Sequence, residues 1–514
     1  MTDSILKFLK YSNFNIKKAI KYKKASEVIC PDLFDSEFYA KRYNIQDDDL
    51  LLNYLFEGYK KGYSPSIDFN GEKYLEDYPN VKKSGMNPLV HYVLYGKKEG
   101  KKIFPLPEKE KDRILNHNLK YLHNYDFEEP FVSIIILNRN GESLLKRLFK
   151  DFKVIANYSN FEVIVVDNDS NDDSVKFLKS LDVDFPLKIV ENDENQSFSK
   201  ANNDAVKIAN GEYVLLLNND IEPTYSWLKE MMGTYLEHDN VGSVGVKLVF
   251  PFYSYENKKS FKIQHASDIF SNRKKEVFYA YNQHSLSDPF DSKVNYTKKC
   301  ISVTGACILI KKSIYDEVGG LDEGYFYGYE DVDFSLKLYQ EGYDIYYCAS
   351  ALLFHHESTS RKEKPHLQEN KDRLTNKWYN LLSKEMFLDK LNHAKFFTEK
   401  TLRFVIVYDE ETVNQESYKK IEELVNFIKE NDYEVTLINN MKKHNIDGLT
   451  DIFISFSQNY DINKLDAREN VIKLLFLDNP NFSDENYDLT LNYTDTESKA
   501  LLKILKDFIL SKYC

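Results

Sequence analysis

The middle of the chain alternates short apolar runs with helical stretches. Four of the runs lead directly into Asn or Asp: FVSIIILNRN, FEVIVVDNDS, LKIVEND and EYVLLLNND. Runs this rich in Val and Ile suit parallel strands that are covered on both faces. Their alternation with helices predicts a doubly wound α/β sheet, in which ligands bind beyond the carboxyl ends of the strands. The Asn and Asp residues lie at those ends and are the first candidates for a functional site.

The same alternation starts again near Thr401. The apolar runs are LRFVIVYDE, YEVTLINN, DIFISFS, VIKLLFLDN and YDLTLNY, with a helix in SYKKIEELVNFIKEN and another at the end. This pattern predicts a second, smaller doubly wound α/β domain over residues 396–514. It contains neither GxGxxG nor a P-loop, so we assign no chemistry to it.

An internal repeat fills residues 31–106. FDSEFYAKRY matches FNGEKYLEDY, and NYLFEGYKKGYSP matches HYVLYGKKEGKKI. Each unit is predicted to form two short helices, and units of this size bury their apolar faces against each other. The repeat has no cluster of catalytic groups, which indicates a spacer, docking or acceptor-handling role, with a protein partner as one of the candidates.

The repeat also carries helix-end signals. Asp35 is predicted to cap a helix, with Phe34 and Tyr39 packed together across its first turn. Gly58 and Gly96 occupy equivalent positions and are predicted to end helices.

A basic amphipathic helix is predicted within residues 1–30, with Ile5, Leu9, Ile16 and Ile20 on one face. Two interpretations remain: peripheral association with an anionic membrane surface, or packing on the protein itself, which we prefer. The charged stretch 107–128 is interpreted as a linker.

Composition narrows the functional class. The chain has 514 residues and a net charge of −12, which argues against a nucleic-acid partner. Its five cysteines include no CxxC pair, so we expect reduced thiols and neither a disulfide framework nor a zinc site. No signal peptide and no long apolar run are visible, so we expect a cytoplasmic protein, with the inner face of the cell membrane as an alternative site.

Two strand-end aspartates suggest donor and metal binding. A carboxylate at Asp167, at the end of VIVVD, can accept the imide N–H of uracil or thymine; the alternative is a plain turn residue. Asp220, at the end of LLLNND, can bind a hard divalent cation that neutralises a diphosphate and assists its departure.

Three carboxylates cluster in YFYGYEDVDF: Glu330, Asp331 and Asp333. Gly328 lets the chain turn, and the carboxylates then begin a helix, whose first turn favours negative charge. A carboxylate that faces a crevice can take the proton from an attacking hydroxyl. Helix capping alone explains Glu330 and Asp333 better than Asp331.

Two adjacent histidines close the strand LLFHHES. Neutral imidazole is a common ligand of Mn²⁺-type ions. Adjacent strand residues point to opposite faces, so only one of His355 and His356 is expected to face the site.

Together these segments resemble a family two glycosyltransferase of the GT-A fold, in the branch of bacterial rhamnosyl- and other surface-glycan transferases. The resemblance covers roughly Pro130 to Leu391. It rests on VSIIILNRN, VIVVDNDSNDDS, NQSFSKANNDAVKIANGEYVLLLNND, IQHAS, TGACILIKKSIYDEVGGLDEGYFYGYEDVDFSLKLYQEGYDIYY and HHES. It implies an α/β GT-A (Rossmann-like nucleotide-diphospho-sugar transferase) domain over residues 129–395.

The resemblance also implies an inverting hexosyl- or deoxyhexosyltransferase. It would move a sugar from a UDP- or dTDP-sugar to a hydroxyl of a glycan, lipid-linked or protein-linked acceptor, with Mn²⁺ or Mg²⁺ as cofactor. Asp331 would be the catalytic base, and Asp220 a metal ligand together with His355, the preferred member of the pair with His356. The implied donor-binding residues are Asn138, Asp167, Asn203, Asn219, Thr304, Gly305, Ala306 and Glu330.

Two positions depart from the family pattern. The metal motif reads Asn218-Asn219-Asp220, without its first carboxylate, and Ser197 stands where the family usually has Gly. An alternative function is therefore a catalytically degenerate transferase that serves as a scaffold or binding subunit of a glycan-assembly complex. A nucleotidyltransferase would need a Gly-rich basic loop, which LNRNGESLLKRL lacks.

Overall fold

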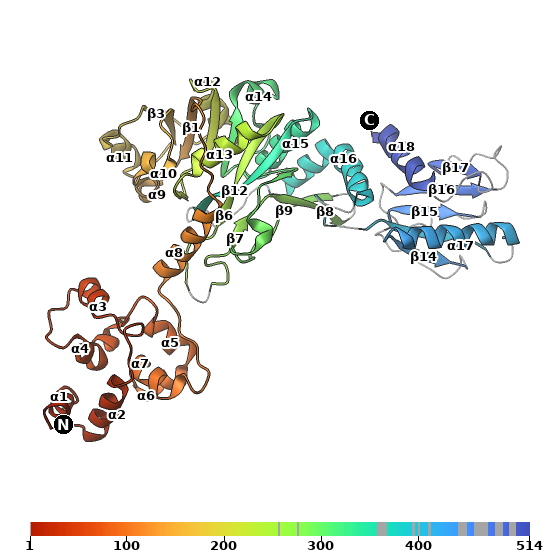
Figure 1. Ribbon diagram of the computed structural model, residues 1–514. Helices are drawn as coiled ribbons and strands as arrows, with labels where there is room; N and C mark the ends of the chain where they lie inside the picture. The colour runs from red at the N-terminus through yellow and green to blue at the C-terminus, as the bar shows by residue number, and fades with distance from the viewer. Residues whose placement is uncertain are drawn as a thin grey trace. The chain divides into compact units, whose positions relative to one another are not determined.

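The computed structural model describes residues 2–513 except 255–256, 275–276, 357–366, 393–395, 399–400, 410–412, 440–449, 457–470, 478–486 and 493–499. The chain divides into two compact units (Figure 1). The first contains residues 1–121, 251–262 and 288–290; the second contains the remainder. None of the described helices has the length and apolar character required to cross a bilayer.

The first unit is helical. Its elements are α1 (Thr2–Tyr11), α2 (Ile16–Ser26), α3 (Ser36–Tyr43), α4 (Leu50–Phe56), η1 (Gly58–Lys61), α5 (Gly71–Asp77), α6 (Pro79–Ser84), α7 (Pro88–His91), η2 (Tyr92–Gly96), α8 (Pro107–Asn118) and η3 (Leu119–Tyr121). The stretch interpreted as a linker therefore contains a helix, α8. The ring of Phe290 lies 4.9 Å from the ring of His117, so α8 packs within this unit.

The predicted N-terminal helix is in fact two helices. The helix is interrupted between α1 and α2, where Asn13 and Phe14 adopt positive φ angles. This break changes the helix phase, so the predicted common apolar face is wrong: Ile16 and Ile20 are 64% and 53% exposed. Ala19, between them in sequence, is instead fully buried.

The two repeats reproduce the same hydrogen bonds. The hydroxyl of Tyr39 donates to Asn53 Oδ1 at 2.8 Å, and the equivalent Tyr74 hydroxyl bonds His91 Nδ1 at 3.0 Å. The predicted cap is confirmed, because Asp35 Oδ1 accepts from the backbone N–H of Phe38 at 2.9 Å. The repeat predicted from sequence is therefore a repeat of contacts as well.

Gly96 is the last residue of η2 and Gly58 follows the C-cap of α4, as predicted, but neither glycine has the left-handed φ of a helix-ending glycine. The left-handed glycines that follow η1 and η2 lie four residues later, at Gly62 (φ +76°) and Gly100 (φ +70°). A Cβ on Gly58 would lie 2.0 Å from the hydroxyl oxygen of Tyr39, and Gly96 has the same relation to its own tyrosine, at 2.3 Å. Both positions are glycine because a buried tyrosine hydroxyl occupies the space of a side chain.

The second unit contains a ten-stranded mixed sheet with the strand order β10-β12-β6-β11-β4-β1-β2-β3, where β5 pairs with β12 and β7 with β6. The predicted parallel strands are confirmed: β1 pairs with β2 and β4, and β2 with β3, all in parallel. Antiparallel β11 joins β4 to β6. Side chains of α9, α10 and α13 form one buried core with the sheet (Figure 1).

The strands of this part are β1 (Val132–Asn138), β2 (Phe161–Asn168), β3 (Leu187–Asn192), β4 (Tyr213–Asn218), β5 (Ile221–Pro223), β6 (Val241–Val249), β7 (Ile263–His265), β8 (Asp268–Lys274), β9 (Val277–Asn282), β10 (Lys298–Cys300), β11 (Cys307–Lys311) and β12 (Asp344–His355). The helices are α9 (Glu142–Leu148), α10 (Phe152–Ala156), α11 (Ser174–Ser180), α12 (Phe198–Lys207), α13 (Trp227–Glu237), η4 (Ser292–Val294), α14 (Lys312–Glu317), α15 (Glu330–Gln340) and α16 (Leu367–Leu391).

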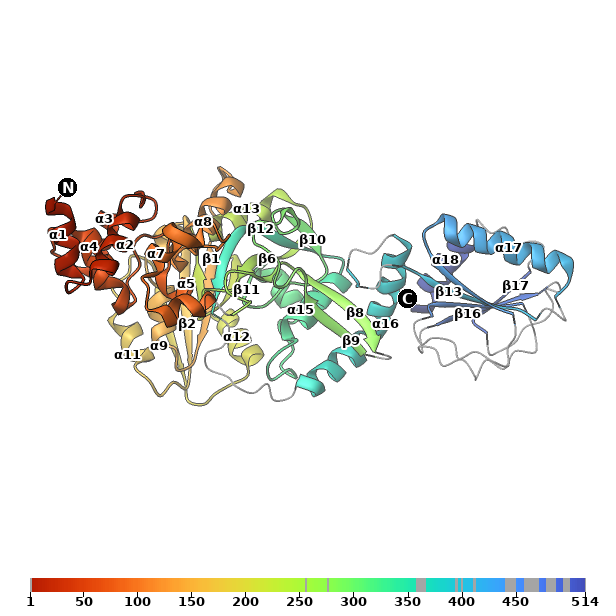
Figure 2. The same cartoon turned by 90° about the horizontal axis from the view of Figure 1, so that it is seen from below.

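The C-terminal part forms the predicted second α/β sheet. It is fully parallel, with the order β14-β13-β15-β16-β17. Its elements are β13 (Arg403–Val407), α17 (Gln415–Glu430), β14 (Glu434–Ile438), β15 (Ile452–Ser455), β16 (Ile472–Leu477), β17 (Leu489–Asn492) and α18 (Leu501–Tyr513). Figure 2 shows α17 and α18 on one face of this sheet, and α16 shares their core. A buried ion pair of 2.7 Å, between Lys390 Nζ and Asp451 Oδ1, also ties α16 to β15.

Candidate functional site

Asn138 holds together the carboxyl ends of three neighbouring strands. Its Nδ2 donates to Asp167 Oδ2 at 3.0 Å, at the end of β2, and its Oδ1 accepts from Asn219 Nδ2 at 2.8 Å, just beyond β4. Asp167 also accepts from the backbone N–H of Ser170 at 3.0 Å. The structure thus brings three predicted donor-binding residues together. Asn138 is fully buried, which makes it a positioning residue for the other two.

Asp220 and His355 meet beside that edge. Strand β5 pairs antiparallel with the end of β12, which places His355 Nε2 3.1 Å from Asp220 Oδ1. His356 points elsewhere: its Nε2 lies 3.0 Å from Glu222 Oε2. The expectation that only one histidine faces Asp220 agrees with this alternation. A carboxylate oxygen beside an imidazole nitrogen is a donor set that suits a Mn²⁺-type ion.

Asp220 and His355 form a pair of candidate metal ligands. Within the residues that the structure describes, no cluster of three or more His, Cys, Asp or Glu side chains is placed to hold a metal ion. A cation on Asp220 and His355 that also bound water or phosphate oxygens would match the usual way that Mg²⁺-type ions bind with a diphosphate.

Asp331 lies in the first turn of α15 and is held by backbone N–H groups. Its Oδ2 accepts from Gly305 at 2.8 Å and its Oδ1 from Val332 at 2.9 Å. A Cβ on Gly305 would come 3.1 Å from the Asp331 Cβ, so a larger residue would crowd this carboxylate. Burial, and then the negative charge of Asp268, raise the pKa of Asp331. A raised pKa is what a carboxylate needs to accept a proton near neutral pH.

The turn that carries Gly305 links Asp331 to the metal-ligand candidates. The carbonyl oxygen of Ala306 accepts from the backbone N–H of Asn218 at 2.9 Å, and Asn218 ends β4 two residues before Asp220. The side-chain oxygen of Thr304 accepts from the Ala306 N–H at 3.3 Å. The predicted sugar-pocket residues therefore lie between the base candidate and the end of β4.

His265 and Asp268 are two site residues that the sequence analysis did not identify. His265 Nε2 accepts from the backbone N–H of Thr304 at 3.3 Å, and burial lowers the pKa of His265 to about 4, so the ring is neutral. Asp268 accepts from the Ser302 hydroxyl at 2.7 Å, and burial raises the pKa of Asp268 to about 7. The only signal was the segment IQHAS, which was part of the resemblance but carried no role.

Asp333 and Asn203 have structural partners. Asp333 is fully buried and accepts from Trp378 Nε1 at 2.7 Å, with Lys377 Nζ at 2.9 Å, so it fastens α15 to α16. The amide of Asn203 bonds Tyr315 at 2.6 Å and Leu321 at 3.0 Å, which holds the loop after α14. The predicted donor contact of Asn203 gains no support from this geometry. Glu330 is buried, and its role in donor binding stays a prediction.

Comparison with known proteins fits this geometry. Residues 133–319 match the family described as Glycosyl transferase family 2, which agrees with the resemblance and with the GT-A fold expected from the sequence. The matched range ends before Asp331 and His355.

Relatives are similar over part of their length. The O-antigen biosynthesis protein RfbC of Myxococcus xanthus is 32% identical over 236 residues, which are 45% of this chain and 18% of that protein. The uncharacterized protein y4gI of Sinorhizobium fredii is 32% identical over 45% of this chain and 25% of its own length. The chain thus spans a quarter or less of these two relatives. The N-acetylglucosaminyl-diphospho-decaprenol L-rhamnosyltransferase of Mycobacterium tuberculosis is 37% identical over 90 residues, 17% of this chain and 27% of that protein.

Among solved structures, GalNAc-T7 with UDP, GalNAc and Mn²⁺ aligns with a TM-score of 0.39 and 14% identity. That alignment covers 60% of this chain and 56% of that one.

Asp268→Asn is expected to move the acid limb of the pH–rate profile to lower pH. A base works when ionised and is lost as the pH falls through its pKa. Because the charge of Asp268 raises the pKa of Asp331, its removal should lower that pKa. The measurement is donor-sugar turnover against pH, with Asp316→Asn, an exposed carboxylate of α14, as the control. An unmoved limb in Asp268→Asn would show that the two carboxylates are not coupled.

Proposed function

We propose that this chain is an inverting glycosyltransferase. It moves a sugar from a nucleotide-diphosphate donor, a UDP- or dTDP-sugar, to a hydroxyl of a glycan, lipid-linked or protein-linked acceptor in surface-polysaccharide or glycoconjugate synthesis. One set of contacts carries the proposal. Asp331 accepts a hydrogen bond from the Gly305 N–H, and the carbonyl of the next residue, Ala306, accepts one from Asn218 at the end of β4. Asp220, which contacts His355, follows two residues after Asn218.

In this reaction Asp331 takes the proton of the acceptor hydroxyl as its oxygen attacks the anomeric carbon of the donor. The new C–O bond forms on the face opposite the leaving group, which inverts the configuration, and the bond to the nucleotide diphosphate breaks. Asp167 accepts a base N–H, and the hydrogen bond that fixes the orientation of its carboxylate, from Asn138, supports this role. Asp220 and His355 would hold Mn²⁺ or Mg²⁺, which neutralises charge on the departing diphosphate.

The relatives bear on the identity of the donor sugar. The names of relatives that act in O-antigen biosynthesis and L-rhamnosyl transfer support a deoxyhexosyl donor, with a hexosyl donor as the alternative.

The second candidate function is a scaffold subunit without catalysis. Asn218 favours it, because this residue stands in place of a carboxylate in the metal motif.

Asp331→Asn is expected to reduce transfer by about 10²–10⁴-fold while donor affinity stays near that of the wild type, because the amide keeps the shape and cannot accept a proton. Turnover of a nucleotide-sugar panel and calorimetric donor binding check this. If Asp331→Asn turns over normally and Glu330→Gln is inactive, the base is the neighbouring residue. If the wild type turns over no donor at all, the scaffold function is favoured.

Metal removal is expected to abolish transfer. Protein treated with EDTA should regain activity with Mn²⁺ or Mg²⁺, and His355→Ala should need a Mn²⁺ concentration about tenfold higher or more for half-maximal activity. His356→Ala is the matched control, because its ring contacts Glu222 and not Asp220. Full activity in EDTA would contradict the metal requirement.

The N-terminal helices support association with an anionic membrane surface. Phe14, Ile16 and Ile20 are 76%, 64% and 53% exposed, and the exposed Lys17 and Lys24 flank the isoleucines on α2. Exposed apolar side chains among lysines are typical of a surface that lies on anionic lipid.

Replacing both isoleucines of α2 by asparagine is therefore expected to weaken binding to vesicles that contain anionic lipid by about tenfold or more. Co-sedimentation with such vesicles measures this, and Val154→Asn, an exposed apolar residue of α10, is the control. Equal sedimentation of wild type and double variant would exclude the proposed contact.

A further inference from the structure

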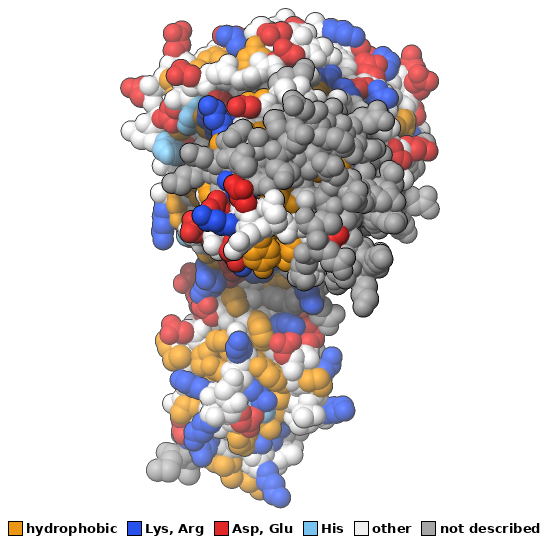
Figure 3. All heavy atoms as spheres, turned by 90° about the vertical axis from the view of Figure 1, so that its right-hand side faces the viewer, with side chains coloured by type: hydrophobic (Ala, Val, Ile, Leu, Met, Phe, Trp, Pro, Cys, Tyr) orange, Lys and Arg blue, Asp and Glu red, His pale blue; other side chains and the backbone are white. Residues whose placement is uncertain are grey.

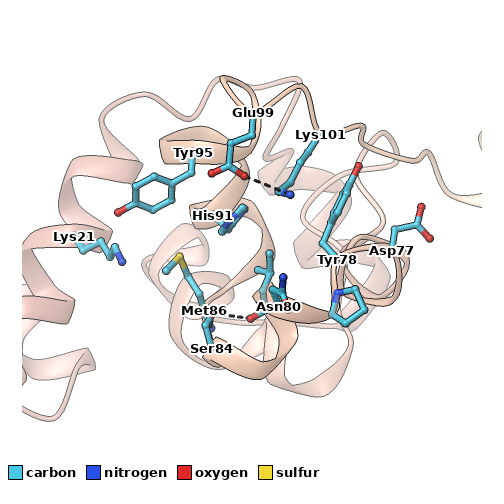
Figure 4. A pocket seen from close by; sticks show the side chains of 12 residues that line it. Lys21, Asp77, Tyr78, Asn80, Ser84, Met86, His91, Tyr95, Glu99 and Lys101 are labelled. Atoms are coloured by element: carbon cyan, nitrogen blue, oxygen red, sulfur yellow. Dashed lines mark hydrogen bonds and ion pairs between the residues drawn. The ribbon is translucent and has the colours of Figure 1, made fainter.

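The helical unit contains a cavity of about 500 Å³. Figure 4 shows the side chains that line it, which come from α2, α5, α6, α7, η2 and the segments next to them. The residues used below are Lys21, Tyr78, His91, Tyr95, Glu99 and Lys101. The volume lies within the range of ~300–1,000 Å³ typical of sites for small ligands.

The cavity combines two aromatic rings with polar groups of both charges. Lys101 Nζ lies 4.4 Å from the Tyr78 ring centre and 3.3 Å from Glu99 Oε2. On the other side, Lys21 Nζ lies 5.2 Å from the Tyr95 ring centre. Burial lowers the pKa of His91, so this ring is neutral at pH 7.

This charge balance selects against ionic ligands. Two lysines, Lys21 and Lys101, stand beside two carboxylates, Asp77 and Glu99, so the lining carries no net charge. A phosphate or nucleotide site would need an excess of cations. Aromatic faces beside paired donors and acceptors instead match a sugar ring, which has apolar C–H faces and a rim of hydroxyls.

The internal repeat provides a built-in comparison. Several core positions keep the same residue in both repeats, as in the pairs Tyr39/Tyr74 and Gly58/Gly96. The cavity positions differ: Asn53, Glu57, Lys61 and Tyr63 of the first repeat correspond to His91, Tyr95, Glu99 and Lys101.

The first repeat shows that the fold does not need the cavity residues of the second. There, Tyr63 lies flat on Tyr43, with ring centres 4.0 Å apart and planes 7° apart. The corresponding pair in the second repeat is Lys101 over Tyr78. Because the stacked tyrosine pair already meets the packing needs of this fold, packing does not explain the charged and polar side chains around the cavity of the second repeat. These side chains therefore point to a ligand.

We propose that this cavity binds a neutral oligosaccharide segment of the acceptor glycan. The identity of that glycan as the acceptor rests on the proposed function; the cavity and its lining do not. The surface of this unit, in the lower part of Figure 3, mixes hydrophobic side chains with charges of both signs, in keeping with a neutral polar ligand.

The test uses the full-length protein and a set of labelled short neutral oligosaccharides built from rhamnose, hexoses and N-acetylhexosamines. Binding is measured by fluorescence anisotropy, with UDP and uronic-acid oligosaccharides as charged comparisons. The wild type should bind members of the neutral set, and the double variant Tyr95→Ala/Glu99→Ala should bind them about tenfold more weakly or worse. The matched control is Glu57→Ala/Lys61→Ala, at the equivalent positions of the first repeat, which should bind like the wild type.

Three outcomes would overturn the proposal: no neutral oligosaccharide binds, only charged ones bind, or both double variants bind equally well. Donor hydrolysis, measured on the same samples, separates this test from that of the transferase function. A cavity variant that loses oligosaccharide binding and keeps donor hydrolysis supports the site. A wild type that binds oligosaccharide but hydrolyses no donor refutes the enzyme proposal and leaves the site in place.

Discussion

The position of Asp331, the proposed base, depends on the buried carboxylate of Asp333. A buried charge is costly unless it is paired and hydrogen-bonded. Asp333 meets this requirement through Trp378, Lys377 and the Tyr325 hydroxyl, which together lock the first turn of α15 against α16. Asp331, two residues earlier, is thereby held where the Gly305 N–H can reach it. The two neighbouring carboxylates thus have different roles: Asp333 anchors the helix, and Asp331 accepts hydrogen bonds from the Gly305 and Val332 N–H groups.

The electrostatics of the site follow from this anchoring. Asp331 keeps a raised pKa because its hydrogen bonds to Gly305 and Val332, which favour the charged form, are outweighed by burial and by the charge of Asp268. His265 hydrogen-bonds the Thr304 N–H and the Asn282 side chain, and its lowering effect on the pKa of Asp331 is smaller than the raising effects of burial and Asp268. A carboxylate kept basic in this way suits proton acceptance from a sugar hydroxyl, whose own acidity is weak.

Sequence patterns predicted the parts of this protein that repeat with a regular period or end a strand. The parallel strands and the smaller C-terminal sheet are as expected, and Asp167 and Asp220 lie at strand ends. Contacts between residues that are far apart in the chain could not be predicted from these patterns. The identity of Gly58 depends on a tyrosine hydroxyl nineteen residues earlier in the chain, and Asp268 reaches Asp331 only through the fold. The break at Phe14 was missed because apolar spacing was extended across a left-handed turn.

The two repeats show how one fold separates stability from recognition. Both bury a tyrosine against a glycine, and both use a tyrosine hydroxyl to accept a backbone N–H, from Ser64 in one and Lys102 in the other. These shared contacts satisfy the packing and polar requirements of the unit. Residues outside these contacts differ at many positions, and around the cavity of the second repeat a stacked tyrosine pair gives way to a lysine over Tyr78. A changed polar set on a concave surface, above contacts that both repeats keep, is the pattern expected when a duplicated module acquires a ligand.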